Sequence, residues 1–385
     1  MSNIGFSFFF LTLGTILLGR GVPMGTVALV NLLGAVYFAR FLAAPVVDRY
    51  GLTRFGHYRG WVMITQVALI GTLAAMSAVD PSADLPALLG LMGLVLALTV
   101  LHDTGLNGLV VRLLPSADRG VASGIATASA GASMLAGSSG ALLLYARAGW
   151  TVTVLALAAV FTIPLAVLAR FTEPPVQPAE DGRAPGRELI DFFRRPHLAA
   201  WAVIVIPVFA ISEWLATSPR TAMLLSAGWP MDRIALVQSL TTAAGALAAL
   251  IAGVAVTRYG RPSTALAMGL LGIVAVAALF PAAAGSADPV PTTAALMAVN
   301  AVYSAKLTWI STVSMDLARP SSAATDYSVP MSVEGVFVTL VNSAGLALAA
   351  QAGFPWLIGI AVVLGLVGTA VGPAWSRRRA DRAAT

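Results

Sequence analysis

Residues 48–60 read DRYGLTRFGHYRG, a short polar loop that carries three arginines between two long apolar runs. Each flanking run is long enough to cross a membrane, for which an α-helix needs about 20 apolar residues. Hydrophobic residues make up 58% of the 385 residues and charged residues only 10%, against roughly 25% charged in a soluble globular domain. The sequence therefore predicts an all-α membrane protein that crosses the bilayer many times.

Twelve apolar runs have the length of a membrane crossing, and we expect each to form one transmembrane helix. They cover residues 4–20, 24–46, 61–79, 87–111, 120–146, 151–170, 198–225, 235–257, 263–285, 292–315, 328–350 and 355–374. The first run has no basic region before it and no A-x-A cleavage pattern after it. We therefore expect it to be a retained span and not a signal peptide.

The arginines predict the orientation of the chain, since Lys306 is the single lysine and lies inside a span. With the N-terminus inside, the cytoplasmic segments carry Arg49, Arg54, Arg59, Arg112, Arg119, Arg170, Arg183, Arg187, Arg194, Arg195, Arg258, Arg261, Arg319, Arg377, Arg378, Arg379 and Arg382. The opposite side has Arg20, Arg147 and Arg233, with Arg220 as a further candidate. The positive-inside rule then places both termini in the cytoplasm. This asymmetry accounts for most of the net charge of +6, so we predict no nucleic-acid partner.

The longest polar interruption divides the chain almost in half. Residues 172–196 are rich in proline and mixed charge, and such a segment has too little apolar surface to pack by itself. We predict an N-terminal six-helix bundle over 1–171, a cytoplasmic linker over 172–196, and a C-terminal six-helix bundle with a short basic tail over 197–385. A shortened basic turn at 258–261 echoes the loop at 48–60, which is typical of transporters with two related halves.

The sequence lacks the motifs of enzymes and of ATP-driven pumps. It contains no cysteine, and His57, His102 and His197 are scattered without metal-ligand spacing. No G-x-x-x-x-G-K-[ST] phosphate loop is present. We therefore predict no cofactor, no metal and no enzymatic activity. A membrane receptor or scaffold without transport activity is the alternative from a different functional class.

The loop at 48–60 and the run before it resemble a known family. The pattern FLAAPVVDRY over 41–50, followed by Arg59, Gly60, Trp61 and Gln66, is similar to the signature loop of the major facilitator superfamily. Its detail resembles the AmpG-like branch, which includes muropeptide permeases and the RhtX/FptX siderophore permeases. Further matches are His102–Asp103, Leu114–Pro115, Arg119–Gly120 and Thr325–Asp326–Tyr327.

This resemblance implies a fold of twelve transmembrane helices in two pseudo-symmetric bundles, in the inner membrane of a bacterium. It also implies a monomeric protein that couples solute movement to protons. Ala44 departs from the family pattern by replacing its usual glycine. Asn107 replaces a carboxylate of the muropeptide permeases, and together with the short chain it favours the siderophore permeases within the branch. The expected function is proton-driven import of an iron–siderophore complex. The alternatives are a permease for muropeptides, which are sugar–peptides, and an exporter of drugs or siderophores.

Ionisable side chains inside a bilayer are costly and usually serve a cavity or a partner. In the resembled fold, spans one, four, seven and ten line the central path. The candidates for substrate binding or proton coupling are His102, Asp103, Asn107, Glu213, Arg220, Tyr303, Lys306, Trp309 and Glu334.

Several of these candidates leave alternatives open. Asp103 and Asn107 share a helix face, whereas His102 is turned about 100° away, so we expect a buried and satisfied histidine. Glu213 could pair with Arg220 or act on substrate or proton. Lys306 needs a counter-ion, which could be the solute or Asp103.

The resemblance also implies a gating loop formed by Asp48, Arg49, Arg54 and Arg59. In the resembled family, the residue matching Asp48 holds the inner gate shut through a helix N-terminus and an arginine of a neighbouring span. The tract 120–140 is rich in glycine, alanine and serine, which predicts close packing between helices and not a binding loop.

Overall fold

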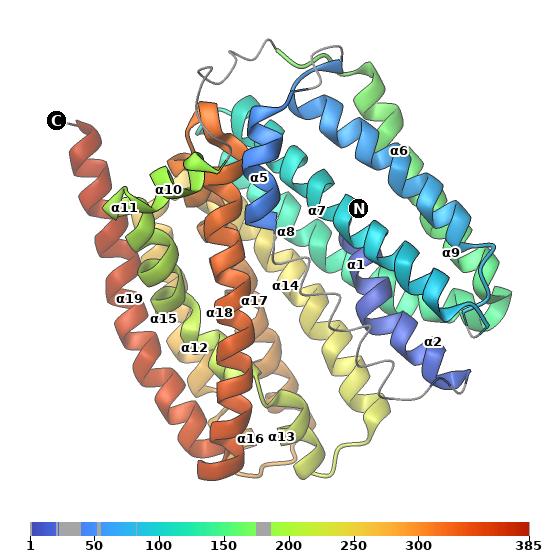
Figure 1. Ribbon diagram of the computed structural model, residues 1–385. Coiled ribbons are helices and arrows are strands. Elements are labelled where there is room, and N and C mark those ends of the chain that lie inside the picture. The colour runs from blue at the N-terminus through green and yellow to red at the C-terminus, as the bar shows by residue number, and fades with distance from the viewer. Residues whose placement is uncertain are drawn as a thin grey trace. The chain divides into compact units, whose positions relative to one another are not determined.

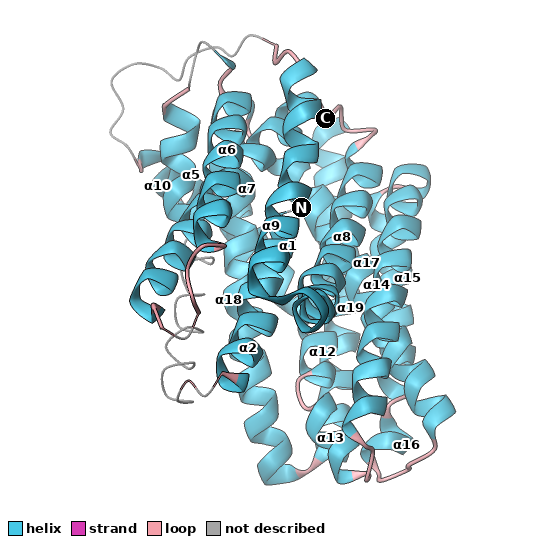
Figure 2. Cartoon of the chain, turned by 90° about the vertical axis from the view of Figure 1, so that its right-hand side faces the viewer, coloured by secondary structure: helices cyan, strands magenta, loops and turns pink. Residues whose placement is uncertain are grey.

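The computed structural model describes residues 2–20, 22, 40–51, 55–81, 83–174 and 186–384. Throughout these ranges the regular elements are helices, and Figure 2 shows no strand among them. The all-α prediction is therefore confirmed. Helices suit a lipid environment because each one satisfies its backbone hydrogen bonds within the segment.

The chain forms two compact units. Unit one contains Met1–Leu113, Ser133–Phe192 and Ala318–Ser332, and unit two contains Leu114–Ala132, Phe193–Leu317 and Val333–Thr385. Helices α8 (Arg119–Leu135) and α18 (Ala323–Ala352) contribute residues to both units. The division into two bundles at 172–196 stays a prediction, and residues 175–185 of the linker lie outside the described part of the chain.

Unit one is built on long apolar helices (Figure 1). Its helices are α1 (Ser2–Ser7), α2 (Gly14–Gly19), α5 (Arg40–Arg49), α6 (Tyr58–Met76), α7 (Leu85–Leu113), α9 (Ala141–Arg170) and most of α10 (Arg187–Phe193), with π-helical turns at Phe8–Leu13 and Ala136–Gly140. Helix α6 packs against α7 and α9. A buried apolar cluster that includes Phe8, Leu69, Met92 and Trp150 forms the core.

Unit two has a core of its own, with α14 along α17 and α12 and α15 along α19 (Figure 1). Its helices are α11 (Pro196–Ala200), α12 (Ile206–Thr217), α13 (Arg220–Ser226), α14 (Met231–Tyr259), α15 (Arg261–Ala277), α16 (Phe280–Ala283), α17 (Pro289–Leu317) and α19 (Phe354–Ala384), with a π-helical turn at Trp201–Val205 and a 3-10 turn at Pro320–Ser322. Met223, Trp229, Val299 and Leu357 are among its buried residues.

Eight stretches of the described chain are long and apolar enough to cross a membrane. One of them, Arg119–Arg170, covers two of the predicted spans, which are separated by Gly149 at φ 76°. The predicted span 24–46 lies mostly outside the described residues. The predicted span 292–315 is the helix α17, which is not among the eight although it has 29 residues.

The predicted span 198–225 is broken near its C-terminal end. Helix α12 ends at Thr217, and a new helix, α13, begins at Arg220. Pro219 lies between them, and a proline cannot donate the backbone hydrogen bond that would continue the helix. The break sets Arg220 on a separate short helix from Glu213.

The glycine-rich tract of α8 packs closely on α14 within unit two. A Cβ atom at Gly120 would lie 2.8 Å from the Gly253 carbonyl oxygen, and one at Gly124 would lie 2.6 Å from the Ala249 oxygen. Both distances are too short for a real side chain. The small residues therefore let the two backbones meet.

Candidate functional site

The Asp48 carboxylate lies at the N-terminus of α18, inside unit one. Its Oδ1 accepts the backbone N–H of Ala324 at 2.9 Å, and its Oδ2 accepts that of Thr325 at 2.8 Å. The Tyr58 hydroxyl donates to Oδ1 at 2.6 Å. Asp48 is only 4% exposed, and these donors at the positive end of a helix stabilise its charge. As the family resemblance implies, a helix N-terminus binds Asp48. The side-chain hydrogen bond to Asp48 comes from the Tyr58 hydroxyl, whereas the resemblance implied an arginine.

A second contact fixes the turn that leads into α18. The guanidinium of Arg319 donates to both carboxylate oxygens of Asp326, from Nε at 2.6 Å and from one terminal nitrogen at 2.7 Å. The backbone N–H of Arg319 also donates to Asp326, at 3.0 Å. These hydrogen bonds raise the pKa of Arg319. A bidentate ion pair therefore fixes the turn before α18 to the first turn of the same helix whose N-terminus binds Asp48.

The arginines of the gating loop have separate roles. Arg59 donates to the carbonyl oxygens of Leu168 at 2.9 Å and Ala169 at 3.1 Å, both in the last turn of α9. A cation at a helix C-terminus is favourable, so Arg59 ties α6 to α9. Among the described residues, Arg59 forms no hydrogen bond with α18. Arg49 lies at the end of α5, with its guanidinium 5.8 Å from the Tyr50 ring centre. Arg54 lies outside the described residues.

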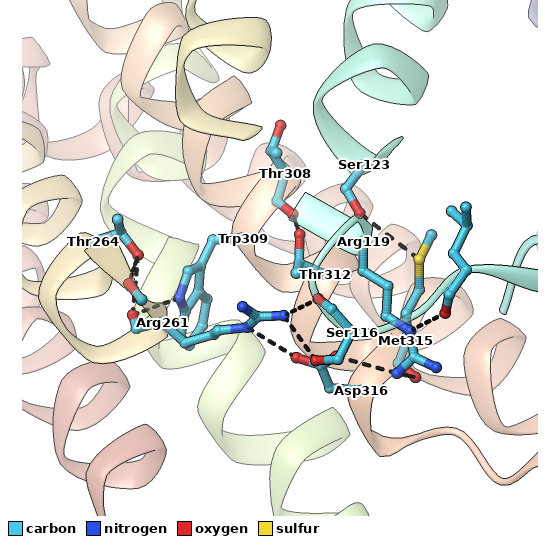
Figure 3. Close-up of polar contacts among 12 residues, drawn as sticks. Ser116, Arg119, Ser123, Arg261, Thr264, Thr308, Trp309, Thr312, Met315 and Asp316 are labelled. Atoms are coloured by element: carbon cyan, nitrogen blue, oxygen red, sulfur yellow. Dashed lines mark hydrogen bonds and ion pairs between the residues drawn. The ribbon is translucent and has the colours of Figure 1, made fainter. Parts of the chain in front are cut away.

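Asp316, at the end of α17, is the centre of a charged cluster in unit two (Figure 3). Its Oδ1 accepts from Arg119 at 3.1 Å and from the Ser116 hydroxyl at 3.2 Å, and its Oδ2 accepts from Arg261 at 3.0 Å. Arg261 also donates to the Ser116 carbonyl oxygen at 2.7 Å. One carboxylate therefore joins the first residues of α8 and α15.

The sequence analysis missed Asp316, although a signal was available. Arg261 belongs to the basic turn that echoes the loop at 48–60, and Arg119 belongs to the matched Arg–Gly motif. An acidic residue at the end of a span, between two arginine-bearing turns, is a natural partner for both. The sequence analysis uses these arginines only as markers of orientation.

His102 and Asp103 touch in α7, contrary to the expectation that they face different surroundings. The Nδ1 of His102 lies 3.4 Å from Oδ1 of Asp103, and the two residues are 4% and 8% exposed. The ring can turn back along the helix, so the 100° between the two Cβ directions does not separate the side-chain tips. The other ring nitrogen, Nε2, has no partner in the described structure, so this histidine is buried but not fully satisfied. Asn107, one turn further, is partly buried.

Lys306 forms a buried ion pair with Glu213. The Lys306 Nζ lies 2.8 Å from Oε1 and 2.9 Å from Oε2 of Glu213, and it donates to the Phe209 carbonyl oxygen at 2.8 Å. The two side chains are 1% and 0% exposed. Gly272 of α15 faces the pair, since a Cβ there would overlap Glu213 Oε1. The counter-ion of Lys306 is therefore Glu213 and not Asp103, and Glu213 is not paired with Arg220.

The remaining candidates divide into packed and partly exposed residues. Trp309 is 0% exposed, donates to the Arg261 carbonyl oxygen at 2.9 Å, and packs beside Trp201. It is thus a core residue and cannot touch a solute in this structure. Tyr303 and Glu334 are partly buried, and the Tyr303 hydroxyl donates to Glu334 Oε1 at 3.4 Å. Arg220 is also partly buried.

The described residues contain no group of three or more histidine, aspartate or glutamate side chains placed to hold a metal ion. The polar groups described above form hydrogen bonds and ion pairs with one another.

A family model described as the major facilitator superfamily matches residues 1–337. The chain belongs to the major facilitator superfamily. Curated relatives of the AmpG type are similar to part of this chain. The chain is 26% identical over 260 residues to the anhydromuropeptide permease of Escherichia coli (strain K12), and the match covers 66% of this chain and 52% of that protein. The chain is also 30% identical over 129 residues to the putative transporter AmpG 1 of Rickettsia prowazekii (strain Madrid E), and this match covers 32% of this chain and 29% of that protein. The matched segments thus span about half or less of these relatives.

Solved structures of the superfamily share the fold. A bacterial homologue of the iron transporter ferroportin, in an outward-facing state, matches with a TM-score of 0.71 at 17% identity. The match covers 98% of this chain and 96% of the homologue's chain. The fucose:proton symporter of E. coli matches with a TM-score of 0.69 at 15% identity, covering 97% and 98%. At these identities the likeness shows the fold alone. The predicted superfamily fold is confirmed, and the chain is a multi-pass member of that superfamily.

Proposed function

We propose that this superfamily member imports a sugar–peptide fragment across the bacterial inner membrane, driven by the proton gradient, with both termini in the cytoplasm. The observation that carries the proposal is the 26% identity over 260 residues to an anhydromuropeptide permease. The siderophore expectation rested on chain length and on Asn107, and the relatives give it no support. The muropeptide alternative is therefore the main hypothesis.

The contacts of Asp48 support a gating role in this proposal. Its carboxylate holds the first backbone N–H groups of α18, and Asp316 holds Arg119 at the start of α8. Both clusters lie at loops that the arginine distribution assigns to the cytoplasm. We propose that both keep the cytoplasmic end of the path closed, and that they open when the solute is released inside.

We assign proton coupling to the His102–Asp103 pair. The Nε2 atom of His102 has no hydrogen-bond partner in the described structure, and a histidine ring nitrogen can accept a proton, so this atom is available to take one up. Glu213, the other carboxylate that we had considered, is already neutralised by direct contact with Lys306. Loading Glu213 with a proton would leave a buried ammonium without its counter-ion, which is costly.

Uptake into proteoliposomes tests the proposed function. Purified protein should accumulate a radiolabelled anhydromuropeptide when the vesicle interior is made alkaline, and a protonophore should abolish that accumulation. A ferric siderophore is the comparison solute. Accumulation of the siderophore without the anhydromuropeptide would overturn the proposed cargo, and flux of neither solute in either direction would overturn the proposal as a whole.

A further inference from the structure

Two cationic side chains lie inside the predicted spans 198–225 and 292–315, and the structure gives them different surroundings. Lys306 is enclosed with its counter-ion Glu213, at 1% and 0% exposure, so it cannot attract a solute. Arg220 makes no ion pair or hydrogen bond with any residue that the structure describes, yet it is only partly exposed. A charge that is partly removed from water without a partner is costly, and within a membrane such groups usually serve a ligand.

The position of Arg220 on α13 indicates that it faces the protein and not the lipid. Met223 and Leu224 are 2% and 3% exposed and belong to the buried core of unit two, whereas Leu225 is 46% exposed. Residues three and four apart share a helix face, so Arg220 lies on the same docked face as Met223 and Leu224. The lipid-facing side of α13 is the one that carries Leu225.

We propose that Arg220 binds a carboxylate of the transported solute, an inference that rests on the proposed function and adds the charge of the substrate to it. A guanidinium offers a planar pair of donors that matches a carboxylate. A lipid phosphate presents similar chemistry, and the test below separates the two sources. Arg220 then sets specificity for anionic solutes, a role that we had considered for Lys306.

The test compares variants and solutes in proteoliposome counterflow. The probes are an anhydromuropeptide with free peptide carboxylates and the same molecule with those carboxylates converted to amides. Wild-type protein should favour the acid over the amide by about ten- to a hundredfold in half-saturation concentration, the usual worth of a charged hydrogen bond. Arg220→Gln should remove this preference by weakening binding of the acid alone, and Arg220→Lys should restore part of it.

The matched control is Arg233→Gln. Arg233 lies in the first turn of α14, and its guanidinium carbon lies 5.4 Å from the centre of the Trp229 ring. Because Arg233 already has this aromatic partner, its loss should leave the preference for the acid unchanged. An Arg220→Gln variant that keeps the wild-type preference would overturn the inference. So would a defect that is equal for acid and amide and occurs only in vesicles with anionic lipid, since that would identify a lipid phosphate as the partner.

A failure of the proposed cargo is distinguishable from a failure of this inference. If wild-type protein transports neither anhydromuropeptide, the same comparison is made with a carboxylate siderophore and a hydroxamate siderophore that lacks carboxylates. A preference for the carboxylate compound that Arg220→Gln abolishes would support the role of Arg220 with a different cargo. No effect of Arg220→Gln on either pair would overturn it.

Discussion

Replacing Lys306 with methionine should destabilise the protein, because the change leaves the Glu213 carboxylate buried without its cation. The Nζ and Oε1 atoms are 2.8 Å apart, and at an effective dielectric near 20 their attraction is roughly 6 kcal/mol before desolvation. Most of that attraction offsets the cost of burying the two charges, and breaking one side of such a pair typically costs about 3–5 kcal/mol. Thermal unfolding in detergent should therefore occur several degrees lower in Lys306→Met than in the wild type.

The double variant Lys306→Met with Glu213→Gln should regain most of the lost stability, because no unpaired charge remains. The matched control is Lys306→Met with Asp103→Asn, which removes a buried carboxylate that the structure does not pair with Lys306. It should regain nothing. Rescue by Asp103→Asn equal to rescue by Glu213→Gln would refute the assignment of the pair, and wild-type stability in Lys306→Met alone would refute the burial argument.

Three further changes test gating and coupling. Asp48→Asn should fold normally but shift the conformational equilibrium toward the inward-open state by about tenfold or more, the worth of a charged hydrogen bond. Single cysteines introduced on the periplasmic side of this cysteine-free protein should then be labelled more slowly. Unchanged labelling together with lost transport would exclude gating. Asp316→Asn should shift labelling in the same direction, whereas the control Asp288→Asn, at an exposed loop aspartate, should not. Asp103→Asn should keep counterflow and lose uphill accumulation of solute; equal loss of both would mean that Asp103 binds solute or holds structure.

The positions of the helices could be predicted because apolar length is a local property of the sequence. The run 292–315 became α17 although Lys306 and several hydroxyl residues lower its hydropathy, since its polar groups find partners inside unit two. Gly149 also marked the end of one span and the start of the next, where its positive φ allows a turn.

The partners of the buried charges could not be predicted. Glu213 lies 93 residues from Lys306 in the chain, and sequence spacing shows only which residues share a helix face. The sequence analysis proposed Asp103 or the solute as the counter-ion of Lys306, whereas the packing of α12 against α17 brings Glu213 to it. Trp309 was misassigned for the same reason, because a tryptophan in a path helix can point to the solute or to its own bundle.

The contact between α8 and α14 has a mechanical consequence. Most helix pairs interlock through side chains, so any sliding of one past the other requires several rotamers to change together. At Gly124 and Gly253 the nearest atoms of the facing helix are backbone atoms, whereas at Gly120 the Thr257 hydroxyl also lies close. A single methyl group added at Gly124 would meet the Ala249 carbonyl oxygen and would therefore force α8 away from α14.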